Sequence, residues 1–157
     1  MIKAESRAEK IIFLGLLILI AAIIGFTTKN QKIENDPIKM TKVVNINHSS
    51  YDEYIGRGTE YRTHMNSRGI QPGEKGWLGN PHPIGWCDIC QTYHSREECI
   101  QAFKKDFYRK INNDSVFQKA VLQLRGKRLG CYCKPKACHG DVIKAWIESQ
   151  PIERKKD

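Results

Sequence analysis

Cysteine is scarce in this sequence, and neither charged nor apolar residues dominate its composition. Six cysteines among 157 residues are too few for a small protein that depends on disulfides. Charged residues make up 27% of the chain and hydrophobic residues 40%, which excludes a disordered polyelectrolyte and a membrane protein with several spans. Internal repeats and low-complexity runs are absent as well. The chain is long enough for one small domain with a modest core.

One long apolar run stands near the amino terminus. Residues 11–26 carry no polar side chain, and a run of this length is at the short end of what spans a bilayer. We expect a transmembrane helix over residues 11–27, preceded by a flank of residues 1–10. A cleaved signal peptide is the main alternative, although bulky side chains occupy the place of the small residues that precede a cleavage site. A buried core helix is the second alternative.

A polar stretch follows this run. Residues 28–42 contain one proline and no aromatic residue, as expected of a tether. A small domain would then occupy residues 43–150, and residues 151–157 would form a disordered tail. The cysteine spacings described below suit a reducing compartment. For the single-pass membrane protein expected from the apolar run, they favour an orientation with the domain in the cytoplasm.

Basic residues outnumber acidic ones. The chain has 26 Lys and Arg residues against 17 Asp and Glu residues, a formal net charge of +9. This balance favours an anionic partner. The candidates are a small molecule or nucleotide, a nucleic acid, and the headgroups of anionic lipids. The basic residues are scattered rather than interleaved with aromatic residues, so they support nucleic-acid binding only weakly.

Strand and helix patterns alternate along the rest of the chain. In order, the expected elements are strands over 43–48 and 51–57, a Gly- and Pro-rich loop over 58–85, helices from Ser95 and from about Ser115, a strand over 127–133 and a helix over 139–150. The first helix is marked by a capping box of Ser95 and Glu98. We therefore expect a small single α/β domain with short strands, three helices and a Cys/His-containing strand–turn–helix.

The strand–turn–helix carries the densest chemistry of the chain. Alternation along a strand puts Cys131 and Cys133 on one face, and Pro135 ends that strand. Cys138 and His139 then fall at the start of the last helix, where free N–H groups and the helix dipole favour negative charge. A thiol in this position should have a lowered pKa, and an anionic ligand would be favoured there too.

Three interpretations of this segment stay open. Its cysteines are core residues, or they bind a metal, or one thiol is a nucleophile. In the third interpretation Cys138 or Cys133 is the nucleophile and His139 its base. Asp141, in the first turn of the helix, would bond free N–H groups or orient His139. Lys134 would attract an anionic ligand.

A second group of cysteines and histidines lies upstream. Cys87 and Cys90 form a C-x2-C pattern, which in a tight turn holds one Zn²⁺ ion. His94 is the natural third ligand. Cys99 falls inside an expected helix and is assigned to the core, so the fourth ligand comes from elsewhere or is water. The alternative is that both residues of the C-x2-C pattern are plain thiols.

Polar residues beside glycines and prolines indicate a cleft. Arg57 stands between Gly56 and Gly58 at the end of an expected strand, where it can bind a phosphate or carboxylate. Asn80 and His82 lie in a Gly- and Pro-rich loop that can aim them into a cleft. We expect these three polar side chains to bind a ligand, although an arginine at a strand end is usually only solvated.

Four segments together resemble a known family. They are Y-I-G-R at 54–57, G-N-P-x-x-I-G at 79–85, S-R-E-E at 95–98 and L-R-G-K-R-L-G-C-Y-C-K-P-K-A-C-H-G-D-V at 124–142. In this order, over residues 50–148, they are similar to DUF4326, a domain family of unknown function. The resemblance implies a small α/β domain and no particular activity. It also implies the shared polar residues Arg57, Asn80, Cys131, Cys133, Cys138, His139 and Asp141.

Three functional hypotheses follow. The first is an enzyme that acts on an anionic nucleotide or phosphorylated substrate through the Cys/His/Asp segment. The second is a zinc-stabilised module that binds nucleic acid or protein without catalysis. The third is a membrane-anchored interaction protein with an inert scaffold.

Overall fold

Three short parallel strands lie at the centre of the folded domain. The computed structural model describes residues 39–59 and 62–152. Strands β1 (Lys42–Asn45) and β2 (Glu53–Tyr54) both pair in parallel with β5 (Arg128–Cys131), which gives the order β1-β5-β2. The carboxyl ends of all three strands therefore meet at one edge of the sheet, where α/β folds place their ligand sites.

The strands are shorter than the sequence pattern predicted, and β5 ends at Cys131 rather than at Cys133. The side-chain amide of Asn45 donates hydrogen bonds to the backbone oxygens of Tyr132, at 3.2 Å, and Lys134, at 2.6 Å. These bonds take the place of strand pairing beyond Cys131. Cys133 consequently lies in the turn that follows the strand.

The three predicted helices are all present. They are α2 (Arg96–Asn113), α3 (Ser115–Leu122) and α4 (His139–Ser149). The hydroxyl of Ser95 accepts a hydrogen bond from the backbone N–H of Glu98 at 3.2 Å, and the Glu98 carboxylate accepts one from the Ser95 N–H at 2.7 Å. The predicted capping box at the start of α2 is thereby confirmed.

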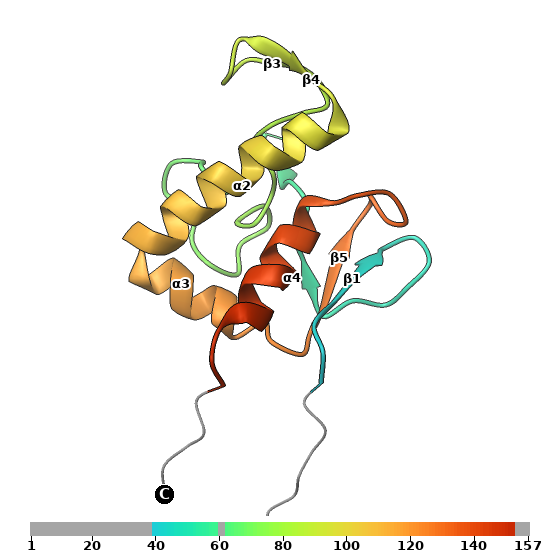
Figure 1. Ribbon diagram of the computed structural model, residues 1–157, viewed down its shortest axis with the longest axis vertical. Coiled ribbons are helices and arrows are strands. Elements are labelled where there is room, and N and C mark those ends of the chain that lie inside the picture. The colour runs from blue at the N-terminus through green and yellow to red at the C-terminus, as the bar shows by residue number, and fades with distance from the viewer. Residues whose placement is uncertain (1–38, 60–61, 153–157) are drawn as a thin grey trace, which may run out of the picture. The chain divides into compact units, whose positions relative to one another are not determined.

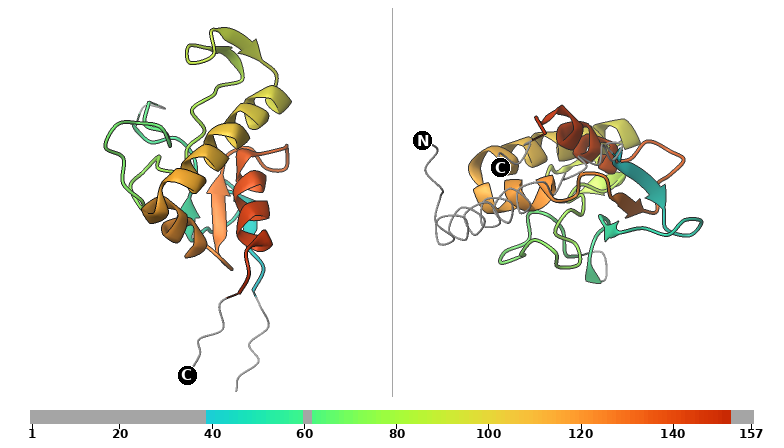
Figure 2. Two further views of the ribbon diagram at one scale, coloured as in Figure 1. Left: turned by 60° about the vertical axis from the view of Figure 1, so that its left-hand side comes forward. Right: turned by 90° about the horizontal axis from the view of Figure 1, so that it is seen from below.

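The apolar faces of the helices pack into one core with the sheet. Helix α2 buries Phe103, Phe107 and Ile111, which recur at helical spacing along one face. The Trp146 ring of α4 meets Phe107 edge to face, with centroids 6.1 Å apart. Figures 1 and 2 show α4 running beside α2 and next to β5 and β1. This packing holds the amino end of α4 beside the carboxyl end of β5.

A two-stranded hairpin, which the sequence pattern did not predict, precedes α2. Strands β3 (Gly85–Cys87) and β4 (Thr92–His94) pair antiparallel, and their turn passes through Gln91, whose φ of 53° is left-handed. The rings of Trp86 and Tyr93 meet on its exposed surface, with centroids 5.3 Å apart. Figure 1 shows the hairpin at the amino end of α2, projecting away from the sheet.

The expected amino-terminal anchor lies outside the described residues. This is true of the flank 1–10, the apolar segment 11–27, most of the tether 28–42 and, at the other end, residues 153–157. Within the described ranges no helix is both long and apolar enough to cross a membrane. Thr41, which the sequence analysis assigned to the tether, is fully buried, so the folded part of the chain begins slightly earlier than expected.

Candidate functional site

A pocket of about 360 Å³ lies where β2 and β5 end and α4 begins. Its volume is in the range of pockets that bind small molecules. Parts of the chain far apart in sequence meet here because the parallel strands end at the same edge. Seven candidate site residues from the sequence line it, namely Arg57, Asn80, His82, Cys131, Cys133, Cys138 and His139.

Three cysteines and a histidine gather in the lining of this pocket. We call Cys131, Cys133, Cys138 and His139 the pocket cluster. The ligand atoms of Cys131, Cys138 and His139 all lie within 4.8 Å of one another. The Nε2 atom of His139 is 2.8 Å from the carbonyl oxygen of Ile55, and its Nδ1 atom is 3.7 Å from the Cys138 sulfur. Because a carbonyl oxygen only accepts, Nε2 carries the proton and Nδ1 faces the thiols.

The pKa values of the groups in the pocket cluster are shifted in different directions. Hydrogen bonds from the other three members hold the pKa of the Cys133 thiol far below its usual range. Hydrogen bonds with Cys131 and Cys133, together with burial, raise the pKa of Cys138. Burial lowers the pKa of His139, but hydrogen bonds with Cys131 and Cys133 outweigh it and raise the value to about 9. The expectation of a lowered pKa at Cys138 is therefore wrong, and the lowered value belongs to Cys133.

Asp141 and Lys134 stabilise the start of α4 and do not line the pocket. The Asp141 carboxylate accepts a hydrogen bond from the backbone N–H of Cys138 at 3.1 Å and lies 2.7 Å from the Lys134 ammonium. Asp141 thus bonds a free N–H group, the first of the two roles expected for it. Gly140 lets the helix approach β2, because a Cβ atom there would lie 2.5 Å from the side chain of Ile55.

Two arginines give the pocket its positive charge. The Nε atom of Arg57 donates to the backbone oxygen of Asn80 at 2.6 Å, and Arg96 donates to the backbone oxygen of Ala137 at 3.2 Å. A guanidinium has five N–H donors, so each arginine keeps donors with which to bind a phosphate or carboxylate. Both side chains line the pocket that contains the thiols.

Asn80 uses its amide within the protein, where it fixes the pocket wall. Its Nδ2 atom donates to the backbone oxygen and the sulfur of Cys99, at 3.3 and 3.1 Å. Its Oδ1 atom accepts from the backbone N–H of His82 at 2.9 Å. The Cys99 thiol is buried, as predicted, and donates to the His82 carbonyl oxygen at 3.0 Å. These bonds fix the backbone of His82.

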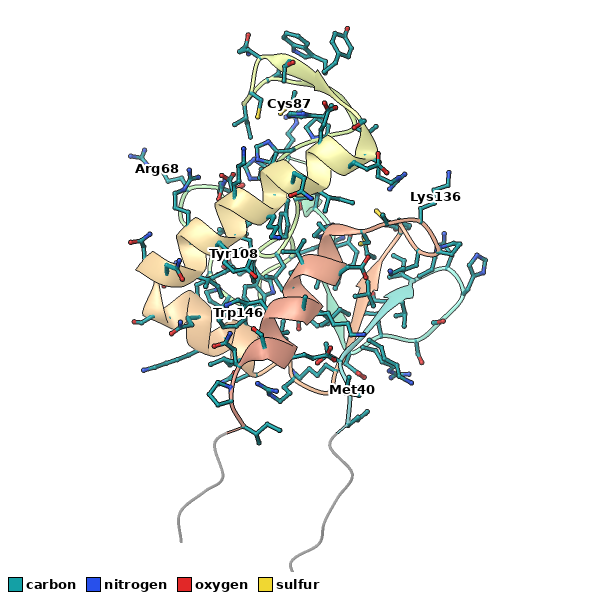
Figure 3. The ribbon with its side chains drawn as sticks, in the orientation of Figure 1. Met40, Arg68, Cys87, Tyr108, Lys136 and Trp146 are labelled. Atoms are coloured by element: carbon teal, nitrogen blue, oxygen red, sulfur yellow. The ribbon has the colours of Figure 1, made fainter. Side chains whose placement is uncertain are left out.

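The ring of His82 belongs to a second group, on the hairpin. We call His82, Cys87, Cys90 and His94 the hairpin cluster, and their ligand atoms all lie within 4.8 Å of one another. The Nδ1 atom of His82 is 3.5 Å from the Cys87 sulfur and 3.3 Å from the Cys90 sulfur. Figure 3 shows Cys87 on the hairpin. His82 was expected in the cleft, whereas the structure also places it among the four residues that could hold a metal ion with the C-x2-C pattern.

The surroundings of the hairpin cluster fit a bound metal ion. The Nε2 atom of His82 lies 3.1 Å from the carboxylate of Asp106, which is held in turn by Asn66 and Arg109. Metal-binding histidines typically donate their second nitrogen to such a carboxylate. The Nε2 atom of His94 is buried and has no hydrogen-bond partner among the described residues. Two thiols and two imidazoles match the donor set of a tetrahedral zinc ion.

Two residues of these sites were not predicted. Arg96 begins α2, and its place in the S-R-E-E segment at 95–98 is the sequence signal that could have identified it. Asp106 lies beside Phe107 on the face of α2 that the apolar pattern marks as buried. An acidic residue on a buried helical face is the signal that could have identified Asp106.

The fold and its sites define a small α/β domain with a pocket at the edge of a parallel sheet and two Cys/His groups that could hold a metal ion. The family model "Domain of unknown function (DUF4326)" matches residues 38–149. The chain belongs to this family, which confirms the resemblance seen in the sequence.

A viral relative also matches the chain. It is the uncharacterized 12.4 kDa protein in the nrdA-td intergenic region of Enterobacteria phage T4, which is 55% identical over 49 residues. The match covers 31% of this chain and 45% of that relative, so the chain spans less than half of the relative's length. No solved structure matches the chain.

Proposed function

We propose that this domain is an enzyme that acts on an anionic small molecule bound in the pocket at the ends of β2 and β5. The observation that carries this proposal is the pocket lining, which unites Arg57 and Arg96 with Cys133 and His139. The arginines would neutralise a phosphate or carboxylate, and the start of α4 would add favourable N–H groups. The Cys/His residues would then act on the bound molecule.

Cys133 is the member of the pocket cluster that is most open to a substrate. Cys131 and Cys138 are only 4% and 1% exposed, whereas Cys133 is half-buried and lines the pocket. Cys138 is also occupied as the cap of α4, since its sulfur accepts from the backbone N–H of Gly140 at 3.3 Å. We therefore assign the nucleophile to Cys133, with His139 beside it.

An aromatic surface beside the arginines favours a nucleotide over other phosphorylated metabolites. Tyr132 is 54% exposed, and its ring lies edge to face with Tyr54 at a centroid distance of 6.5 Å. Both tyrosines line the pocket. A nucleobase can stack on an exposed aromatic ring while its phosphate meets a guanidinium.

The binding step is tested by thermal shift of the full chain with nucleoside monophosphates and diphosphates, sugar phosphates and inorganic phosphate. We expect at least one nucleotide to raise the melting temperature of the wild type but not of Arg57→Ala. Arg68→Ala is the control, because Arg68 is exposed and does not line the pocket. Equal shifts in all three proteins, or no shift with any anion, would contradict the proposal.

The assignment of Cys133 is tested by alkylation with iodoacetamide, read by mass spectrometry of peptides. In metal-free protein we expect Cys133 to react before Cys131 and Cys138, because those two thiols are buried. A nucleotide that raises the melting temperature should slow the reaction at Cys133. If Cys133 reacts as slowly as the buried thiols, its assignment as the nucleophile is excluded.

The hairpin cluster supports a zinc ion with a structural role. His82, Cys87, Cys90 and His94 would hold the ion, which would fix the hairpin against the first turns of α2. Arg96 comes two residues after the end of β4, so this zinc would also steady one of the two pocket arginines. The free energy of zinc binding would then contribute to the stability of the fold.

A binding module without catalysis is the second candidate function, and the exposed hairpin aromatics favour it. Trp86 is 46% exposed and Tyr93 is 72% exposed, and such rings can stack on the bases of single-stranded nucleic acid. Trp77 and Trp146 are buried, so Trp86 would dominate any change in fluorescence on binding. Salt-sensitive quenching by single-stranded DNA, lost in Tyr93→Ala, would favour this function over the enzyme.

We also propose that residues 11–27 anchor the chain in a membrane, with the domain in the cytoplasm. The apolar run at 11–26 supports the anchor, and the free thiols of the domain support a reducing compartment. An anchored chain should stay in the membrane fraction after washing with alkaline carbonate. Release into the supernatant would exclude the anchor.

A further inference from the structure

We propose that the pocket cluster holds a second zinc ion, separate from the one proposed for the hairpin. Its ligands would be Cys131, Cys133, Cys138 and the Nδ1 atom of His139. The presence of a substrate beside this ion rests on the proposed function, whereas the metal site itself does not. Metal binding itself rests on the geometry of Cys131, Cys138 and His139, to which the neighbouring Cys133 would be added as the fourth ligand.

The spacing of the donor atoms fits a tetrahedral zinc ion. Around zinc, with Zn–S distances of about 2.3 Å and Zn–N distances of about 2.0 Å, neighbouring ligand atoms lie about 3.5 to 3.8 Å apart. The Cys138 sulfur is 3.7 Å from the Nδ1 atom of His139. The Cys131 sulfur lies within 4.8 Å of both atoms. Cys133 lines the same pocket and would supply the fourth ligand.

The ring of His139 is oriented as in a metal site. Its Nε2–H group donates to the carbonyl oxygen of Ile55 at 2.8 Å, which leaves Nδ1 directed at the thiols. Metal-binding histidines are commonly held in this way by a carbonyl or a carboxylate. His82 has the same arrangement, with Nε2 on the carboxylate of Asp106 and Nδ1 directed at two thiols. The two clusters therefore share one mode of histidine orientation.

Burial and charge also agree with a metal. All six cysteines lie in the described part of the chain, and none of them forms a disulfide. Three thiols at one point thus remain available as soft ligands, which zinc prefers over harder cations such as magnesium. Three thiolates, one neutral imidazole and Zn²⁺ together carry a single negative charge. Arg57 and Arg96 line the same pocket and would offset this charge.

The second zinc gives the proposed enzyme a defined reactive group. A metal ion keeps a coordinated thiol deprotonated at neutral pH. Cys133 is the ligand that is half-buried and in contact with the pocket, so its zinc-bound sulfur would face the substrate. The buried ligands Cys131 and Cys138 would hold the ion in place.

Metal content of the full chain, measured by elemental analysis, tests the inference. We expect about two zinc ions per wild-type chain and about one in Cys133→Ser or in Cys138→Ser. Cys90→Ser, in the hairpin cluster, should also retain about one. Tyr93→Ala is the control and should keep both, because Tyr93 is exposed and belongs to neither cluster. Unchanged zinc content in both pocket-cluster variants would overturn the inference.

Cobalt spectroscopy keeps the test decisive if Cys138→Ser fails to fold. Co²⁺ is titrated into the Cys87→Ser/Cys90→Ser double variant, in which the pocket cluster is the one of the two clusters that retains its thiols. We expect the double variant to show thiolate-to-cobalt absorption. Adding Cys133→Ser to the double variant should weaken this absorption. No such absorption from a folded double variant would overturn the second site. If the double variant fails to fold, the zinc content of Cys133→Ser decides, since Cys133 is only half-buried.

The outcomes separate this inference from the proposed function. About one zinc ion per chain, lost entirely in Cys90→Ser, overturns the second site and leaves anion binding at Arg57 unaffected. About two zinc ions per chain without any thermal shift by nucleotides or phosphate supports the second site and contradicts the proposed substrate class.

Discussion

Arg57 and Asn80 are joined by a hydrogen bond of 2.6 Å from the guanidinium Nε to the backbone oxygen. The side chain of Asn80 in turn accepts the backbone N–H of His82, whose ring belongs to the hairpin cluster. One residue thus connects an arginine of the pocket to a histidine of the candidate metal site. A change in the hairpin can reach the pocket through these two bonds.

Replacement of Asn80 by alanine should destabilise the domain. The change leaves the buried backbone N–H of His82 without its acceptor, which costs about 1–3 kcal/mol of the free energy of unfolding. Urea denaturation measures the loss. Asn47→Ala is the control, since Asn47 is exposed, and it should change the free energy by less than about 0.5 kcal/mol. Equal effects of the two substitutions would contradict the structural role of Asn80.

Removal of zinc from the hairpin cluster should lower the melting temperature of the full chain. A strong chelator removes the ion and with it the binding free energy that supports the fold. Asp106→Asn should lower zinc affinity about 10- to 100-fold, because the Asp106 carboxylate orients His82. Competition with a coloured chelator measures this affinity.

Tyr93→Ala is the control for that experiment. Tyr93 lies on the same hairpin but is 72% exposed and supplies no ligand. It should keep both the zinc affinity and the melting temperature of the wild type. A chain whose melting curve is the same with and without chelator, and that contains no zinc when purified, would rule out a structural metal.

Phe103 should be one of the most sensitive core positions. It is fully buried and its ring contacts His139 at a centroid distance of 4.9 Å, so truncation opens a cavity behind the pocket cluster. Phe103→Ala should cost about 3–5 kcal/mol of the free energy of unfolding. Tyr108→Ala on the same helix should cost less than about 1 kcal/mol, because Tyr108 is 38% exposed. Denaturant midpoints of both variants provide the comparison.

Acid should weaken the contact between β5 and the residues before β2. The Asp52 carboxylate accepts hydrogen bonds from the side chain and the backbone N–H of Arg128, which hold the pKa of Asp52 well below its usual range. A lowered pKa in the folded state stabilises the fold above the unfolded pKa of about 3.9, and the gain is lost as pH falls further. Between pH 5 and 2, the free energy of unfolding should fall more steeply in the wild type than in Asp52→Asn. Parallel slopes for the two proteins would contradict this role of Asp52.

Local signals in the sequence predicted the helices well. Ser95 and Glu98 lie three residues apart and cap α2 without help from distant residues. The hairpin β3–β4 was not predicted, because its strands have three residues each and its cysteines obscure any alternation. The end of β5 was placed two residues too late, since the bond donor that ends it, Asn45, comes from β1.

The candidate sites depend on contacts between distant residues, and the sequence pattern predicted only part of them. Cys138 and His139 were found because they are adjacent at a helix start. His82 could not be assigned to the hairpin cluster from spacing alone, because it precedes the C-x2-C pattern in a loop between two prolines. Its partner Asp106 comes from the second half of α2 and is brought close only by the fold.

The strand order β1-β5-β2 determines when the sheet can form during synthesis on the ribosome. The central strand, β5, is the last of the three to be synthesised, and neither of its neighbours can pair with the other in its absence. The nascent chain therefore lacks this three-stranded sheet until residues 128–131 have left the exit tunnel, although the hairpin β3–β4 can pair earlier. Contacts of such long sequence separation are slow to form. The three-stranded sheet can therefore form only after most of the domain has been synthesised, and a metal ion at the pocket cluster would bind after that.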